Sequence, residues 1–270
     1  MKERIQKILA NAGVDSRRNV EEMIRQGRIA VNGKTVWEAP VLIDPETDKV
    51  VVDGQLVRLA TSGPQRRHYF ILNKPRGVYS TNVAQGAQVR AIDLLPRKLG
   101  ARLYPVGRLD AESKGLLLLT NDGELTNRLT HPRFGVAKTY RAIVAGYIEQ
   151  RMLGPLEKGI WMGDKSGKGF KTPRSRIRIL HRSGQQSVLE ITIREGRELP
   201  VRRILAKLGH KVKELTRVKM GPLTLEGLSP GKFRPLTAKE VRLLQKLPMK
   251  VGRKEDQGRV AEEGEEEGEE

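Results

Sequence analysis

A short run of four leucines near the middle of the chain most constrains the fold. The run, residues 116–119, is closed by the turn signal at residues 121–123, and an apolar run of this length between loop signals predicts a buried strand. Residues 107–109 lead into a single aspartate, Asp110, and Gly115 opens the run. These residues predict a tight loop that exposes one carboxylate at a strand end, where catalytic groups often lie on a rigid scaffold. The alternative is that Asp110 only caps a turn.

The rest of the chain beyond residue 68 contains further strand signals and few helix signals. Strands are predicted at residues 69–78 and 138–144, and a hairpin is predicted from residues 176–180 and 188–194, which alternate apolar and polar side chains. Helices are predicted at residues 124–129, at 201–209, and from the capping box at Thr237 to about residue 247. Strands and helices do not alternate regularly. We therefore expect an α+β domain with a mixed, mainly antiparallel sheet and flanking helices.

Residues 1–60 predict a small, separate α/β unit. Two short amphipathic helices are separated at Gly13, and Asp15 or Ser16 can cap the second helix. Turns at residues 32–33 and 53–54 predict two hairpins. The predicted organisation is therefore this unit, a polar linker at 61–67, a larger domain at 68–248 and a disordered charged tail at 249–270.

The net charge of the chain indicates the kind of partner that it binds. The formal net charge is +19, although residues 253–270 contain three basic and nine acidic residues, so the remaining chain carries +25. A body this basic favours a polyanion partner, most commonly nucleic acid. A membrane surface is the competing interpretation, but no basic amphipathic helix, lipidation signal, signal peptide or transmembrane segment is evident. We expect a cytoplasmic protein that does not bind membranes.

Many of the basic residues crowd the small N-terminal unit. They predict a surface that follows RNA phosphates, whereas the alternative is a solvated charged face. The candidate RNA-binding residues are Arg4, Lys7, Arg17, Arg18, Arg25, Arg28 and Lys34.

Several kinds of site are absent from the sequence. The chain has no cysteine and only four scattered histidines, which disfavours a metal centre. The glycine- and lysine-rich residues 165–173 lack the spacing of a phosphate-binding loop and predict a mobile basic loop instead. Neither a serine nucleophile elbow nor a dinucleotide fingerprint is present. From the residues alone, the chain is an RNA-binding protein with one candidate carboxylate site, for which Arg108, Arg202 and Arg203 are candidate guanidinium partners and Tyr140 offers a flat face for a base.

Two sets of motifs resemble known families. Residues 5–13, 16–18 and 23–34 resemble the S-four-type RNA-binding domain. Residues 107–110 followed by 113–124 resemble the first motif of pseudouridine synthases, and the closest branch modifies ribosomal RNA and carries an N-terminal domain of the S-four type. Further matching segments occur in the same order as in that family, at residues 72–77, 138–140, 195–197, 201–203, 215–217, 221–225 and 231–236.

The resemblance implies a reaction and assigns roles. Asp110 would be the nucleophile that attacks the target uridine, Tyr140 would stack on the flipped base, and Arg202 would pair with Asp110. Arg108 and Lys74 would support the site. The implied reaction converts uridine to pseudouridine by isomerisation, so it requires no cofactor or metal.

The resemblance also implies a substrate. We expect ribosomal RNA or a pre-ribosomal particle, favour the large subunit, and expect a monomer. The alternatives are a small-subunit enzyme, a non-catalytic ribosome-assembly factor and, more weakly, a duplex DNA binder. The sequence departs from the family at residues 198–200, Glu-Leu-Pro, where Pro200 cannot donate a backbone hydrogen bond. This departure puts a polar contact of the site in doubt.

Overall fold

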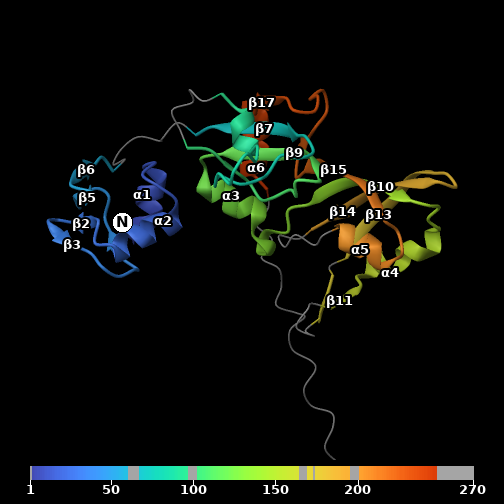
Figure 1. The fold of residues 1–270 in the computed structure, drawn as a ribbon, viewed down its shortest axis with the longest axis horizontal. Coiled ribbons are helices and arrows are strands. Elements are labelled where there is room, and N and C mark those ends of the chain that lie inside the picture. Colours follow the sequence, from blue (N-terminus) through green and yellow to red (C-terminus); the bar gives the residue numbers. More distant parts are fainter. Residues whose placement is uncertain are drawn as a thin grey trace, which may run out of the picture.

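The computed structural model describes residues 2–59, 67–96, 102–163, 169–172, 174–194 and 201–247, with the side chains of residues 169 and 170 left aside. The predicted linker up to residue 66, the departure at residues 198–200 and the predicted tail lie outside these ranges, as do residues 165–168 and 173 of the predicted basic loop. Figure 1 shows a small N-terminal body in blue beside a larger body that contains the rest of the elements.

The N-terminal body packs two helices against a four-stranded sheet. Helix α1 (Ile5–Asn11) contacts α2 (Arg17–Arg25), and the Ser16 hydroxyl accepts a hydrogen bond from the Asn19 N–H at 3.1 Å, so Ser16 is the cap of α2. The two predicted hairpins are confirmed. Their turn residues Asn32 and Asp53 have φ of 50° and 49°, as two-residue hairpin turns require. The sheet order is β3 (Lys34–Thr35), β2 (Ile29–Val31), β5 (Val50–Val52) and β6 (Gln55–Val57), and a separate pair is formed by β1 (Glu3–Arg4) and β4 (Leu42–Ile43).

The larger body is built on a nine-stranded sheet. Its main path is β13 (Ser175–Arg182), β14 (Gln186–Ile193), β10 (Lys138–Ala145), β15 (Val212–Met220), β9 (Lys114–Thr120), β7 (Tyr69–Lys74) and β17 (Phe233–Pro235). Two short strands, β8 (Tyr104–Pro105) and β16 (Leu223–Thr224), pair with β9 and β15. Every pairing of these strands is antiparallel except that of β9 with β15. The predicted α+β class with a mainly antiparallel sheet is therefore confirmed.

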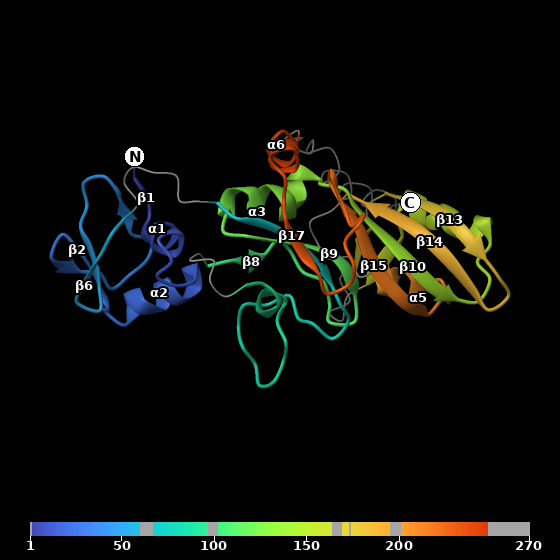
Figure 2. The same ribbon diagram turned by 90° about the horizontal axis from the view of Figure 1, so that it is seen from above.

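Helices cover both faces of the sheet, as Figure 2 shows from above. On one face, Leu116 and Leu118 pack with residues of α3 (Gly123–Thr130) and α6 (Ala238–Gln245). On the other, Leu117 and Leu119 pack with Ala91 of a 3₁₀ turn, η1 (Ala91–Leu94). The alternation of the leucine run therefore fills two cores.

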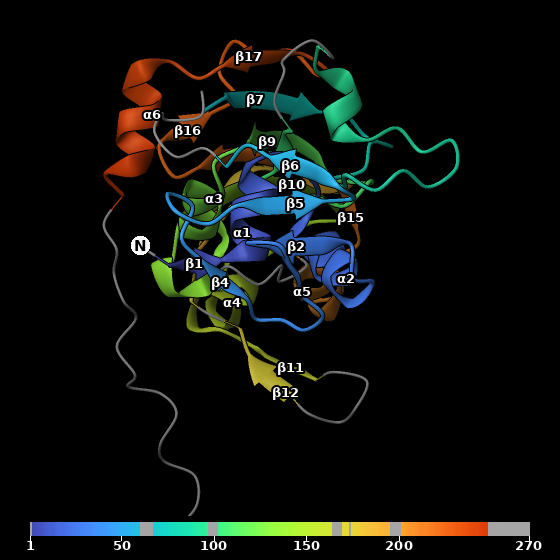
Figure 3. The same ribbon diagram turned by 90° about the vertical axis from the view of Figure 1, so that its left-hand side faces the viewer.

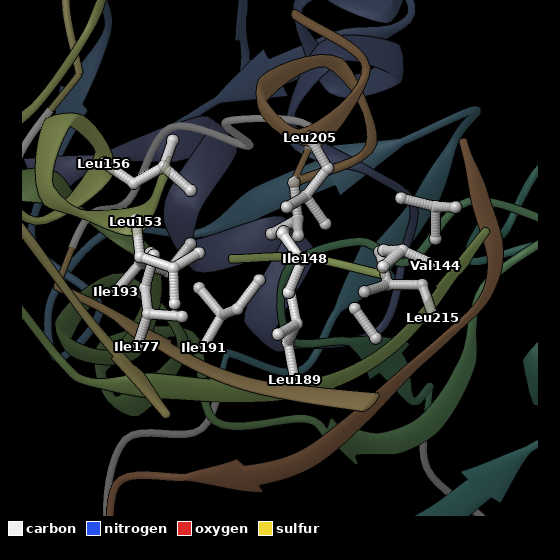
Figure 4. Close-up of a cluster of buried hydrophobic side chains, with 13 residues drawn as sticks. Val144, Ile148, Leu153, Leu156, Ile177, Leu189, Ile191, Ile193, Leu205 and Leu215 are labelled. Atoms are coloured by element: carbon white, nitrogen blue, oxygen red, sulfur yellow. The ribbon is translucent and has the colours of Figure 1, made fainter. Parts of the chain in front are cut away.

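A third core lies under the far half of the sheet (Figure 4). It joins β10, β13, β14 and β15 to α5 (Val201–Lys207) and α4 (Gly154–Lys158), which follows the 3₁₀ turn η3 (Gln150–Leu153). A second 3₁₀ turn, η2 (Pro132–Phe134), follows α3. A fourth hydrophobic cluster is confined to the N-terminal body, and no cluster mixes residues from before and after residues 60–66. We therefore propose the domain boundary in that segment.

The sequence did not predict the central strand β15. Its charged residues Lys213, Glu214 and Lys219 interrupt the apolar alternation that marks a strand. Buried Val212, Leu215 and Met220 nevertheless face the cores, and the strand lies between β10 and β9. This strand determines the site described below.

Gly115 allows β9 and β15 to run side by side. It has φ of +108°, and a Cβ added there would lie 2.3 Å from the carbonyl oxygen and 2.8 Å from the nitrogen of Arg217. Backbone atoms cannot yield as the end of a flexible side chain can. Only glycine fits this position without moving one of the two strands.

We expect Gly115→Ala to lower the free energy of unfolding by at least about 2 kcal/mol, because it combines a backbone clash with a strained φ. Urea denaturation followed by circular dichroism measures the change. Gly184→Ala is the control, since a Cβ there would have no neighbour within 4 Å. Equal stabilities of the two variants would contradict the proposed role of Gly115.

Candidate active site

A row of residues crosses four neighbouring strands and forms the floor of the site. Tyr140 on β10 is the partner of Arg217 on β15, Arg217 is the partner of Gly115 on β9, and Gly115 is the partner of Lys74 on β7. Directly paired residues on neighbouring strands project to the same face of a sheet. The sheet register therefore brings together side chains from residues 74, 140 and 217.

Arg217 is buried, with 1% of its surface exposed. Its Nε donates to the Leu116 carbonyl at 2.7 Å, and its Nη1 donates to the Arg108 carbonyl at 3.4 Å. Nη2 is buried and has no hydrogen-bond partner in the described part of the chain. Arg217 thus links the central strand to the loop that carries Asp110 and keeps one donor unused.

The backbone of the Asp110 loop is held at five consecutive carbonyl groups. Three of these carbonyls accept hydrogen bonds from cationic side chains, one accepts from a hydroxyl and one from a backbone N–H within the loop. The donors to the carbonyls of residues 108 to 112 are, in order, Arg217, Ser80 Oγ at 3.0 Å, the Ser113 N–H at 2.9 Å, Lys74 together with the Gly77 N–H at 2.8 Å, and Arg202. The Ser80 hydroxyl also accepts from the Leu109 N–H at 3.1 Å. These hydrogen bonds hold the backbone of the Asp110 loop in one conformation before a substrate binds.

The carboxylate of Asp110 stays free. The residue is exposed, and no hydrogen bond or ion pair joins its side chain to another described residue. The turn is closed by its backbone carbonyl and not by its carboxylate. The geometry therefore disfavours the interpretation of Asp110 as a turn cap.

Lys74 is fully buried at the end of β7. Its Nζ donates to the carbonyls of Val78 at 2.7 Å, Pro75 at 3.0 Å and Ala111 at 3.4 Å. Burial lowers the pKa of Lys74 to about 8, while the negative charge of Asp110 opposes that shift and the positive charge of Arg217 adds to it. The amine and the carboxylate of Asp110 are thus electrostatically coupled.

Arg202 lies against the Asp110 loop but does not pair with Asp110. Its guanidinium donates to the carbonyls of Val212 at 3.2 Å and Glu112 at 3.1 Å, and its Nε is buried without a partner among the described residues. The predicted direct pair is absent from this structure because the guanidinium is held on the carbonyl of Glu112, two residues beyond Asp110, and on that of Val212 on β15. The other candidates form no ion pair with Asp110 among the described residues: Arg203 donates to the Gly163 carbonyl at 3.4 Å, and Arg108 is exposed.

Tyr140 lies where two cores meet. Its half-buried side chain packs against the cluster under β10 to β15 and also against the cluster that contains Leu109. The ring therefore packs on the core that also holds Leu109 of the Asp110 loop, and its role as a flat face for a base stays a prediction.

Two residues of the site were missed as site residues in the sequence. Arg217 stands two positions after buried Leu215 on β15, in phase with the apolar face of the strand. An arginine in phase with a buried face is a signal that could have been read. Ser80 carries no such signal, because its role depends on a contact with Leu109, 29 residues away.

The basic residues of the N-terminal body fall into two groups. Three of the predicted RNA-binding residues form ion pairs, namely Lys7 with Glu3, Arg25 with Glu22 and Arg28 with Asp53, at 2.6 to 2.7 Å. The other four are exposed and form no ion pair with a described residue: Arg4, Arg17, Arg18 and Lys34.

One ion pair joins the N-terminal body to the larger body. Arg102 Nη1 lies 2.9 Å from a carboxylate oxygen of Asp15. A groove of about 900 Å³ runs alongside, with Gly13, Asp15 and Arg17 on one wall and Tyr104 and Asn127 on the other. The groove walls are rich in amide and hydroxyl groups.

In the part of the chain that the structure describes, no helix combines the length and the apolar character needed to cross a membrane. Among the same residues, His, Cys, Asp and Glu side chains form no group of three that could hold a metal ion.

The buried Lys74 predicts a pH dependence of stability. Its folded pKa of about 8 lies below the ordinary 10.5, so between these values the unfolded chain binds the proton and the folded chain does not. The free energy of unfolding should therefore rise with pH across this window, by up to about 3 kcal/mol relative to Lys74→Met. Urea denaturation of the wild-type protein and of Lys74→Met between about pH 7.5 and 10 measures the difference in their free energies of unfolding. The control is Lys219→Met, which removes an exposed amine, and the same pH dependence in all three proteins would contradict the prediction.

Comparison with known proteins identifies the family. Residues 68–207 match the family described as RNA pseudouridylate synthase, and residues 3–38 match the S4 domain. A relative from Aquifex aeolicus, named as an uncharacterized RNA pseudouridine synthase, is 45% identical over 91% of this chain and 95% of its own length. The ribosomal large subunit pseudouridine synthase B of Bacillus subtilis is 40% identical over 91% of this chain and 96% of its own length.

A solved structure supports the same family assignment. The crystal structure of a pseudouridylate synthase is similar to 89% of this chain and 99% of its own, with a TM-score of 0.62 and 31% identity. The chain belongs to the RNA pseudouridylate synthase family, and it is an isomerase of that family with an N-terminal S4 domain.

Proposed function

We propose that this protein converts a specific uridine of large-subunit ribosomal RNA to pseudouridine, with Asp110 as the nucleophile. The observation that carries the proposal is the free Asp110 carboxylate on a loop whose backbone is fixed at residues 108 to 112. A nucleophile that is already positioned loses little entropy on attack. The name of the Bacillus subtilis relative supports the choice of the large subunit.

In the proposed reaction, Asp110 attacks the target nucleotide and the C1′–N1 bond breaks. A carboxylate oxygen of Asp110 bonds to C1′ as the detached uracil takes the electron pair of the C1′–N1 bond. The uracil turns over and C5 bonds to C1′ while the Asp110–C1′ bond breaks, which returns its electron pair to the carboxylate. The proton on C5 leaves and N1 gains one, so the product is an isomer of the substrate and no electrons are exchanged with a cofactor. Tyr140 would stack on the flipped base and take part in removing the C5 proton.

The buried cations beside the loop suit the charge that develops. The departing uracil carries negative charge, and fixed positive groups stabilise such charge most strongly where water is excluded. Lys74 and Arg217 are both buried. The N–H groups at Arg217 Nη2 and Arg202 Nε donate no hydrogen bond to another described residue. We infer that one of these donors reaches Asp110 or the substrate when RNA is bound.

The target base must leave its stack before Asp110 can reach it. Phosphate contacts from the four predicted RNA-binding residues that form no ion pair, Arg4, Arg17, Arg18 and Lys34, would offset that cost. We infer a monomer that acts in the cytoplasm on ribosomal RNA or a pre-ribosomal particle. A small-subunit target and a non-catalytic assembly role are the alternative outcomes of the experiment below.

Asp110→Asn should abolish pseudouridine formation, because the amide keeps the size of the side chain and removes the nucleophile. Unmodified transcripts of both ribosomal RNAs are incubated with each protein, and carbodiimide-stop primer extension maps the modified base. Circular dichroism is the control for folding.

Each outcome decides one part of the proposal. A wild-type protein that modifies neither RNA would refute catalysis and favour the assembly role. A site in the small-subunit transcript would change the target only. An Asp110→Asn variant as active as wild type would remove Asp110 from the mechanism.

Replacing both Arg17 and Arg18 by alanine should weaken RNA binding and make it less sensitive to salt. Each lost phosphate contact lowers the slope of log affinity against log salt by about one. Arg25→Ala is the matched control, because Glu22 already pairs with its guanidinium at 2.7 Å. Filter binding at several salt concentrations measures the slopes, and equal slopes for all three proteins would count against this surface.

A further inference from the structure

A small hairpin stands apart from the main sheet. Strands β11 (Trp161–Gly163) and β12 (Gly169–Lys171) pair only with each other among the described strands, and they project from the larger body in Figures 1 and 3. Its base is fixed, because the Thr172 N–H donates to the Ile160 carbonyl at 2.8 Å and the Thr172 hydroxyl accepts from the Ile160 N–H at 2.9 Å.

The alternation of β11 places a tryptophan on its outer face. Met162 is buried with 6% of its surface exposed, whereas Trp161 is 62% exposed. Burial of apolar surface therefore does not account for a large aromatic side chain at this position. A residue of this size on a wet face is typical of a contact surface.

The chain has one other tryptophan, Trp37, which is similarly exposed at 61% but packs against the backbone of its own body. Trp37 covers Gly27, where an added Cβ would lie 2.3 Å from the ring. Trp37 therefore has a packing partner in the N-terminal body. No ring contact or cation–π contact involving Trp161 occurs among the described residues.

Positive charge surrounds Trp161. Lys171 is its directly paired residue on β12, so the two side chains project to the same face. From α5, Lys207 donates to the Trp161 carbonyl and Arg203 donates to the Gly163 carbonyl. Lys158 and Glu157 are also exposed nearby in the chain. An aromatic ring with neighbouring cations is the combination that holds single-stranded nucleic acid.

Helix α5 connects this hairpin to the site. Arg203 and Lys207 are one helical turn apart and hold β11, while the neighbouring Arg202 donates to the Asp110 loop. The hairpin is therefore anchored to the same short helix as the catalytic loop.

We propose that Trp161, with Lys171, is a second RNA contact at which an unpaired nucleotide of the substrate stacks on the indole while the amine meets its phosphate. This contact lies outside the uridine site and rests on the proposed function only for the choice of RNA as ligand. The positive surroundings favour RNA over an apolar protein partner. The stacked base can be of any type, because every base has a flat face.

The two tryptophans permit a direct test. Trp37→Phe leaves Trp161 as the only tryptophan, and stacking of a base should then quench its fluorescence when unmodified large-subunit ribosomal RNA transcript is added. A fully paired RNA duplex should quench it much less. In the matched Trp161→Phe protein, the response of Trp37 measures the quenching that does not come from Trp161, because Trp37 is exposed in the N-terminal body.

Truncation tests the energy of the contact. Trp161→Ala should raise the Kd for the transcript and the KM for pseudouridine formation by roughly tenfold, with kcat unchanged. Trp161→Phe should keep most of the affinity, because it retains a stacking ring. The control is Leu180→Ala, which trims another side chain that is 44% exposed.

The proposal is overturned if Trp161 fluorescence does not respond to RNA and Trp161→Ala binds as tightly as wild type. It is also overturned if duplex and transcript quench equally, which would indicate a contact without stacking. Failure of the proposed function would be seen separately, as an absence of pseudouridine with wild-type protein, and quenching of Trp161 would still support the RNA contact in that case.

Discussion

The parallel contact between β9 and β15 at Gly115 is the constraint on which the site depends. Without a Cβ at Gly115, the backbone of Arg217 lies close enough for its guanidinium to reach the carbonyls of Leu116 and Arg108. The same register aligns Lys74 and Tyr140 on either side. A site made from four strands therefore depends on one glycine.

The site uses its cations in an uncommon way. Arg217, Lys74 and Arg202 bind backbone carbonyls of the Asp110 loop and not the carboxylate. A carbonyl offers less compensation to a buried charge than a carboxylate does, and the lowered pKa of Lys74 reflects that deficit. In return, the loop is rigid and the carboxylate remains free to react. The burial of these cations and the free carboxylate thus have the same origin, which is the binding of the cations to the loop backbone.

The sequence predicted the features that a few neighbouring residues specify, and it missed the contacts between residues that lie far apart in the chain. The hairpin turns, the capping box at Thr237 and the loop with its single aspartate are specified within a few residues, and each was found where the structure has it. Arg217 was missed as a site residue because its role comes from the pairing of β15 with β9, 101 residues away from Leu116. The predicted Arg202–Asp110 pair stays a prediction, because in this structure the packing of α5 directs the guanidinium to the carbonyls of Val212 and Glu112.

The net charge of the chain overestimates the number of cationic side chains that are free to bind RNA. Some of the basic side chains are buried beneath the Asp110 loop, and others are paired with Glu3, Glu22 and Asp53. Cations that are already held release fewer counterions on binding, so they contribute less to RNA affinity. Two groups of exposed cations, at the start of α2 and around Trp161, lie in different bodies of the molecule. Under the two proposals made for these groups, one RNA spans both bodies, so recognition would depend on the shape of a folded RNA and not on the target base alone.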